Sequence, residues 1–203
     1  SGYSRSQPRR LKGQAQFTFL KIQTMNLFTY TIVTSLGLLI AGFTFALNKD
    51  AWNRYIRSFP RSTKFSLLFM GLSLLWFLVG HVSNLSEADF GEYKILIGTI
   101  GVGIAVGAFF YVNDFLAVRG LSILLLFYSR EVLDSAFLHE SQSRLLLVSI
   151  IYLIIVLSLY LGAWPYRIRD FFTWIFDQAN RSRNFGMLLI LLGVVLGVST
   201  FAY

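Results

Sequence analysis

The 203-residue sequence contains no cysteine, which excludes disulfide bonds, cysteine-ligated metals and thiol catalysis. Charge is also scarce: Asp, Glu, Lys and Arg make up 14% of the chain, whereas a typical soluble domain carries about 25%. Apolar residues make up 55% and aromatic residues 17%. A soluble protein needs more charge than this on its surface, so the composition predicts an integral membrane protein that contacts membrane lipids.

Proline is rare as well, and the three prolines, Pro8, Pro60 and Pro165, all lie outside the long apolar runs. Transporters commonly bind substrate where a membrane helix is interrupted, so uninterrupted helices favour a static bundle. The metalloprotease signature HExxH, the nucleophile elbow GxSxG and the Walker A motif are absent from the sequence. We therefore expect a protein that is not an enzyme and that has no cofactor and no metal site.

Apolar runs of nearly 20 residues or more are the strongest positive signal, because about 20 apolar residues span a bilayer as a helix. Five runs meet this length or come close: Met25–Leu47, Phe65–Val82, Lys94–Val112, Leu145–Trp164 and Phe185–Ala202. A sixth run, Phe115–Leu138, has only ten uncharged residues between Arg119 and Arg130. Taken alone, this run also fits a re-entrant or interfacial segment.

The distribution of basic residues favours six spans, because cytoplasmic loops of membrane proteins are rich in Lys and Arg. The loop 48–64 contains five basic residues and the loop 165–184 contains four. These two loops lie on the same side of the membrane only if the run Phe115–Leu138 crosses it. We therefore predict an all-α polytopic bundle of six transmembrane helices, with both loops cytoplasmic, both termini outside, and a location in a bacterial inner membrane.

Two segments outside the long apolar runs lead to separate predictions. The stretch Arg169–Gln178 alternates aromatic and polar residues at helical spacing, which predicts a short amphipathic helix on the cytoplasmic surface. Residues 1–24 are polar and basic, and Met25 begins the first apolar run. We expect 1–24 to be a non-native or disordered basic extension, with a genuine extension as the alternative. Residues 25–203 then form a single six-helix transmembrane domain.

The charged residues of the sixth run form the leading candidate for a polar site. Arg130 and Asp134 are four residues apart and can pair on one helix face, with Glu131 beside them. Ionisable groups at membrane depth commonly mark pathways or partner contacts. The cluster Arg130, Glu131 and Asp134 is therefore either a functional site or a self-neutralised pair at the outer interface.

Small residues and histidines give weaker signals. Gly103 with Gly107, and Gly193 with Gly197, form GxxxG spacings that let membrane helices approach closely, either within the chain or between subunits. His81 and His139, the two histidines of the sequence, are weak candidates for binding a cofactor. The net charge of +8 does not indicate a nucleic-acid partner, because the basic residues are divided among several loops.

Three functions stay open on this basis. The first is a non-enzymatic structural or accessory subunit that acts through helix–helix contacts, either in a homo-oligomer or with other membrane subunits. The second is a small channel or transporter that uses the charged cluster of the sixth run. The third is a membrane enzyme that acts on lipid or quinone.

Overall fold

The computed structural model describes residues 7–83, 91–111, 114–137 and 142–202, with side chains from residue 27 onward except at 51, 91 and 202. Within these ranges the regular structure is entirely helical. The α-helices are α1 (Gln7–Leu47), α2 (Asp50–Ser58), α3 (Thr63–Trp76), α4 (Lys94–Tyr111), α5 (Leu116–Ala136), α6 (Arg144–Ala163), α7 (Tyr166–Asp177) and α8 (Ala179–Ser199). A π-helical segment, Phe77–Val82, continues α3, and short 3-10 helices lie at Phe59–Arg61, Gly91–Tyr93 and Thr200–Ala202.

The described residues contain five segments long and apolar enough to cross a membrane, so the prediction of a polytopic helical membrane bundle is confirmed at this level. They are Leu27–Leu47, Thr63–Val82, Lys94–Tyr111, Arg144–Ala163 and Ala179–Ser199. These segments agree with the five apolar runs of the sequence. Helix α5 is outside this set, since it carries Arg119, Arg130, Glu131 and Asp134. Helix α1 begins at Gln7, and the prediction that 1–24 is an extension stays a prediction.

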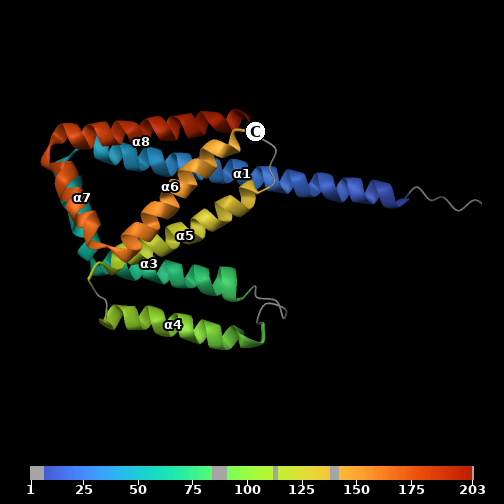
Figure 1. Ribbon diagram of the computed structural model, residues 1–203, viewed down its shortest axis with the longest axis horizontal. Coiled ribbons are helices and arrows are strands. Elements are labelled where there is room, and N and C mark those ends of the chain that lie inside the picture. Colours follow the sequence, from blue (N-terminus) through green and yellow to red (C-terminus); the bar gives the residue numbers. More distant parts are fainter. Residues whose placement is uncertain (1–6, 84–90, 112–113, 138–141, 203) are drawn as a thin grey trace, which may run out of the picture.

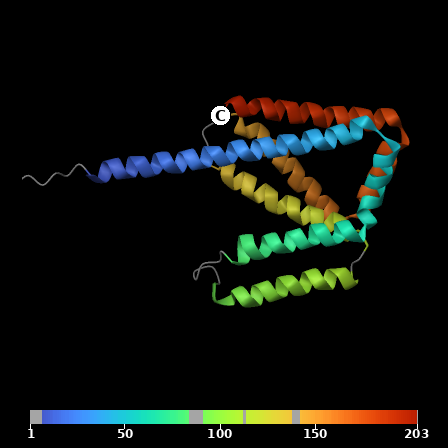
Figure 2. The same ribbon diagram turned by 180° about the vertical axis from the view of Figure 1, so that it is seen from behind.

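The helices run between two ends of the bundle (Figures 1 and 2). Helices α1 and α8 lie side by side, α3 and α4 form a second pair, and α5 and α6 run obliquely between the pairs. The short helices α2 and α7 lie across one end, which we call the α7 end. Helices α1 and α4 end at the α7 end, and α3 and α5 begin there, so α5 runs from this end to the opposite one. Helix α7 joins α6 to α8 at the same end.

Glycine allows the close approach of α1 and α8. A Cβ added to Gly186 would fall on the backbone nitrogen of Ala46, and would lie 2.7 Å from the carbonyl oxygen of Gly42. A Cβ on Gly42 would in turn lie 2.8 Å from the backbone nitrogen of Ile190. With both side chains missing, the two backbones meet directly, which is how membrane helices gain packing energy in the absence of a hydrophobic driving force.

Helix α5 is the centre of the bundle, although it carries four charged residues. It has nine buried residues, more than any other helix in the described part of the chain: Leu116, Ala117, Val118, Gly120, Ser122, Ser129, Val132, Ser135 and Ala136. It contributes to all three buried clusters, with α1, α6 and α8, with α3 and α4, and with α7. Because α5 faces protein more than lipid, its low hydropathy is compatible with a position inside the bundle.

Helix α7 confirms the predicted helix in the segment Arg169–Gln178, and it begins slightly earlier, at Tyr166. Its apolar face packs on the end of the bundle, where Ile168 and Phe172 form a buried cluster with Val118 of α5. Trp174 remains exposed. Helix α7 therefore covers the helix ends instead of lying with its apolar face free toward lipid.

Candidate functional site

Arg130 and Asp134 lie in the last two turns of α5, away from the α7 end. The Nε atom of Arg130 is 3.8 Å from Oδ2 of Asp134, and the two side chains are 58% and 69% exposed. An ion pair this long and this exposed contributes about 0–1 kcal/mol to stability. The geometry is that of a loose pair at the helix end.

Glu131 differs from these two residues. It is half-buried, and among the described residues it makes no ion pair. It lies two turns after Leu124, on the same face of α5, and is close enough to Tyr30 of α1 to act on it electrostatically. The structure thus separates Glu131 from the Arg130–Asp134 pair, because Glu131 points to a different side of α5 from the face that Arg130 and Asp134 share.

A hydroxyl network that the sequence analysis missed lies next to Glu131. The Tyr128 hydroxyl is 2.7 Å from Thr34 Oγ1, and it also donates to the carbonyl oxygen of Tyr30 over 3.3 Å. Thr34 Oγ1 bonds to the same carbonyl at 2.7 Å. These bonds join α5 to α1. The only signal in the sequence is the presence of Thr34 and Tyr128 inside apolar runs, which does not say that they meet.

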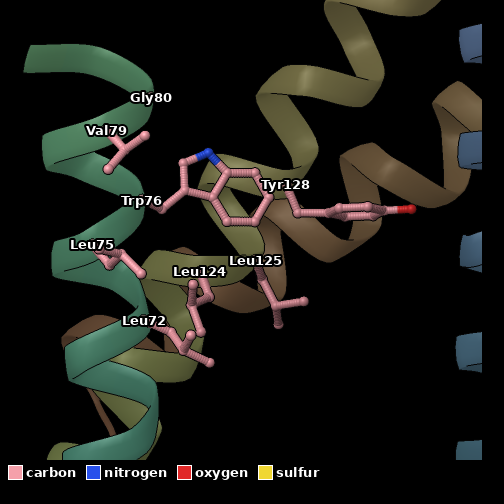
Figure 3. Close-up of a pocket in the computed structure, with 8 residues that line it drawn as sticks. All are labelled: Leu72, Leu75, Trp76, Val79, Gly80, Leu124, Leu125 and Tyr128. Carbon is pink, nitrogen blue, oxygen red and sulfur yellow. The ribbon is translucent and has the colours of Figure 1, made fainter. Parts of the chain in front are cut away.

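An apolar groove of about 600 Å³ lies between α3 and α5. Its lining includes Leu72 and Leu75 of α3, Val79 of the π-helical segment and Leu124 of α5. In Figure 3 the Trp76 ring reaches from α3 toward α5, and the Tyr128 ring points away from α3. The groove offers almost no polar surface, so it suits hydrocarbon.

A second cavity, of about 450 Å³, lies beneath α7 and is bounded by α1, α6, α7 and α8. We call it the α7 cavity. Its walls are formed by Phe45, Leu157, Tyr160, Leu161, Ile168, Phe171, Phe172, Phe185 and Leu189, with Arg167 as the one charged residue of the lining. Unlike the α3–α5 groove, this cavity combines an apolar interior with a cation.

His81, one of the two weak cofactor candidates, lies in the π-helical segment after α3. Its ring packs on Phe127 of α5 with centroids 4.9 Å apart, and its Nδ1 atom is buried without a hydrogen-bond partner. His139 lies outside the described residues. Across the residues that the structure does describe, no group of three His, Asp or Glu side chains could hold a metal ion.

The four glycines singled out for helix packing have different surroundings. A Cβ on Gly193 would lie 2.9 Å from Leu39, and a Cβ on Gly197 would lie 2.9 Å from Ser35 Oγ, both on α1. Ser35 Oγ also donates a 2.7 Å hydrogen bond to the carbonyl of Gly193. Gly103 and Gly107 on α4, in contrast, have nothing within 4 Å of an added Cβ.

The sequence matches no protein-family model, no curated protein and no solved structure. The chain is an α-helical integral membrane protein. Its function has to be inferred from how its own residues are arranged in the bundle.

Proposed function

We propose that the protein is a non-enzymatic accessory subunit of a membrane complex, and that it acts through helix–helix contacts made by α4. The observation that supports this is the weak attachment of α4 to the rest of the chain. Only Ala105 of this 18-residue helix is buried. Gly103 and Gly107 face open space, although glycine at this spacing commonly serves close helix packing.

The partner that best fits this face is a second copy of the chain. Gly103 and Gly107 are one turn apart, and Val106 and Phe110 lie on the neighbouring part of the same face. Phe110 is 80% exposed. Two such faces are self-complementary, because the large side chains of one α4 can fill the space above the glycines of the other, as a two-fold interface requires. Another membrane subunit with a similar helix is the alternative partner.

The proposal includes six transmembrane helices, with α5 as the one that the apolar runs identify least clearly. Its support is that α5 is central in the bundle and that both basic loops lie at the α7 end. Because cytoplasmic loops are rich in Lys and Arg, the proposal orients the α7 end toward the cytoplasm. A bacterial inner membrane is the proposed location. Both termini then face outward.

Transport through the charged cluster has less support. Arg130 and Asp134 are each more than half exposed and face one another, as interfacial pairs do. Neither residue lines the α3–α5 groove or the α7 cavity. A membrane enzyme acting on lipid or quinone also has less support, because neither the α3–α5 groove nor the α7 cavity is lined by a carboxylate, a histidine, a serine or a threonine.

Replacing both Gly103 and Gly107 by leucine is expected to shift the protein from oligomer to monomer. Overpacking a close contact costs about 1–3 kcal/mol, which corresponds to an association weaker by roughly fivefold to 150-fold. The oligomeric state is measured by single-molecule photobleaching of labelled protein in liposomes over a range of protein-to-lipid ratios.

The matched control is Gly71→Leu on α3, because an added Cβ at Gly71 also meets nothing within 4 Å. This variant should associate as the unmodified protein does. A protein that is monomeric at every ratio and that purifies without a partner would rule out the proposed function. Equal effects of the α4 and α3 substitutions would also rule out α4 as the interface.

A further inference from the structure

The α7 cavity lies at the α7 end of the bundle, between α1, α6, α7 and α8. Helices α6 and α8 are held apart by α7 at the α7 end and approach each other toward the opposite end, with α1 behind them (Figure 1). At about 450 Å³ it is too small for a helix, which with its side chains is about 10–12 Å across. It is large enough for a flexible hydrocarbon chain.

Aromatic rings that pack against one another line the interior of the cavity. The ring of Phe45 lies 5.2 Å from that of Phe185, and Phe171 lies 5.5 Å from Phe185 on the other side. Leu157 and Leu189 complete the walls from α6 and α8. The part of the cavity that these apolar side chains line has few partners for water and is stabilised by apolar contents.

Arg167 is placed differently from the other arginines near α7. Arg169 pairs with Asp170 at 3.1 Å, and Arg181 stacks on Trp174 at 5.1 Å. Arg167 lines the cavity, is exposed, and makes no ion pair with any described residue. Its guanidinium lies 5.7 Å from the Tyr166 ring centre. Stacking on a ring leaves the N–H groups at the guanidinium edge free to bind an anion in a forked geometry.

We propose that the α7 cavity binds one anionic phospholipid, with an acyl chain between α6 and α8 and the phosphate on Arg167. A cation at the mouth of an apolar cavity matches an amphiphile whose head is negative and whose tail is hydrocarbon. Basic pockets between membrane helices bind anionic headgroups in this way.

The charge around the site selects an anionic headgroup over a zwitterionic one. The α7 end carries basic residues from several elements, namely Lys49, Arg54, Arg57, Arg61, Lys64, Arg119, Arg167, Arg169, Arg181 and Arg183. Four acidic residues, Asp50, Asp114, Asp170 and Asp177, offset them only in part. A headgroup that carries its own ammonium gains less in this positive field than phosphatidylglycerol does.

The test is native mass spectrometry of the full chain released from mixed bilayers of phosphatidylglycerol and phosphatidylcholine. The unmodified protein is expected to retain one phosphatidylglycerol in preference to phosphatidylcholine. Arg167→Gln should weaken this binding about fivefold, the effect of one basic residue on an anionic lipid. Arg169→Gln removes the same charge two residues further along α7, from a residue that does not line the cavity and that pairs with Asp170, and should weaken retention much less.

A second pair of variants tests the tail. Leu189→Trp fills the cavity and should abolish retention, whereas Leu188→Trp, on the exposed side of α8, should not. Inorganic phosphate at high concentration should not displace the lipid. Equal weakening by Arg167→Gln and Arg169→Gln would show diffuse surface attraction and overturn the proposal. So would equal retention of both lipids, displacement by phosphate alone, or lipid retention in a folded Leu189→Trp variant.

Discussion

Replacement of Gly186 by alanine is expected to lower the free energy of unfolding of the bundle by about 1–3 kcal/mol, the usual cost of overpacking. The added methyl group would meet the backbone of Ala46 and Gly42, and a backbone cannot move aside as a flexible side chain can. Helices α1 and α8 would have to separate along their whole contact. The measurement is the midpoint of unfolding in detergent micelles as sodium dodecyl sulfate is added.

The control is Gly37→Ala on α1, where an added Cβ meets nothing within 4 Å. Alanine has a higher helix propensity than glycine by about 1 kcal/mol, so this variant should be as stable as the parent or slightly more so. Gly186→Ala should therefore lower the free energy of unfolding, whereas Gly37→Ala should leave it unchanged or raise it slightly. A Gly186→Ala protein as stable as the Gly37→Ala protein would contradict the described packing of α1 on α8.

Replacement of Gly120 by alanine is expected to have a similar effect, about 1–3 kcal/mol, at the contact between α3 and α5. The added Cβ would lie 2.8 Å from the backbone nitrogen of Met70. It would also disturb a buried hydrogen bond of 2.9 Å that Ser73 Oγ donates to the carbonyl of Gly120. The same unfolding titration measures the loss.

Gly162→Ala on α6 is the matched control for this site, because its Cβ would lie 3.8 Å from the nearest atom, an ordinary contact with Ser122. If α5 were a peripheral segment instead of the central helix, alanine would be tolerated equally at Gly120 and Gly162. Equal stability of the two variants would therefore remove the evidence that α5 is held between α3 and α6.

The sequence predicts the helical class and five long segments well, because a helix in lipid needs an uninterrupted apolar run and little else. It predicts α7 from the spacing of its aromatic residues. It does not predict that the apolar face of α7 packs on the bundle, since hydropathy is the same for a side chain that faces lipid and for one that faces protein. The sequence does not predict the burial of α5 for the same reason.

The packing glycines show a second limit of the sequence. The GxxxG spacing drew attention to Gly103 and Gly107, which face open space, whereas the closest contacts with the backbone of a neighbouring helix are at Gly42, Gly120 and Gly186. A spacing identifies small residues on one face of a helix, but not which helix they meet. Arg167 was likewise only one of four basic residues in a loop until the fold placed it at the α7 cavity.

The central claim is that α5 crosses the bilayer, and because the chain contains no cysteine, single cysteines can test it directly. Ser58, the last residue of α2, and Gln178, between α7 and α8, are exposed at the α7 end. Gln142, which lies shortly before α6, is exposed at the opposite end. Each of the three is replaced by cysteine in a separate variant. In intact cells, a membrane-impermeant maleimide should label Gln142→Cys and spare the other two until the membrane is opened. Labelling that places positions 58 and 178 on opposite sides of the membrane would contradict the claim.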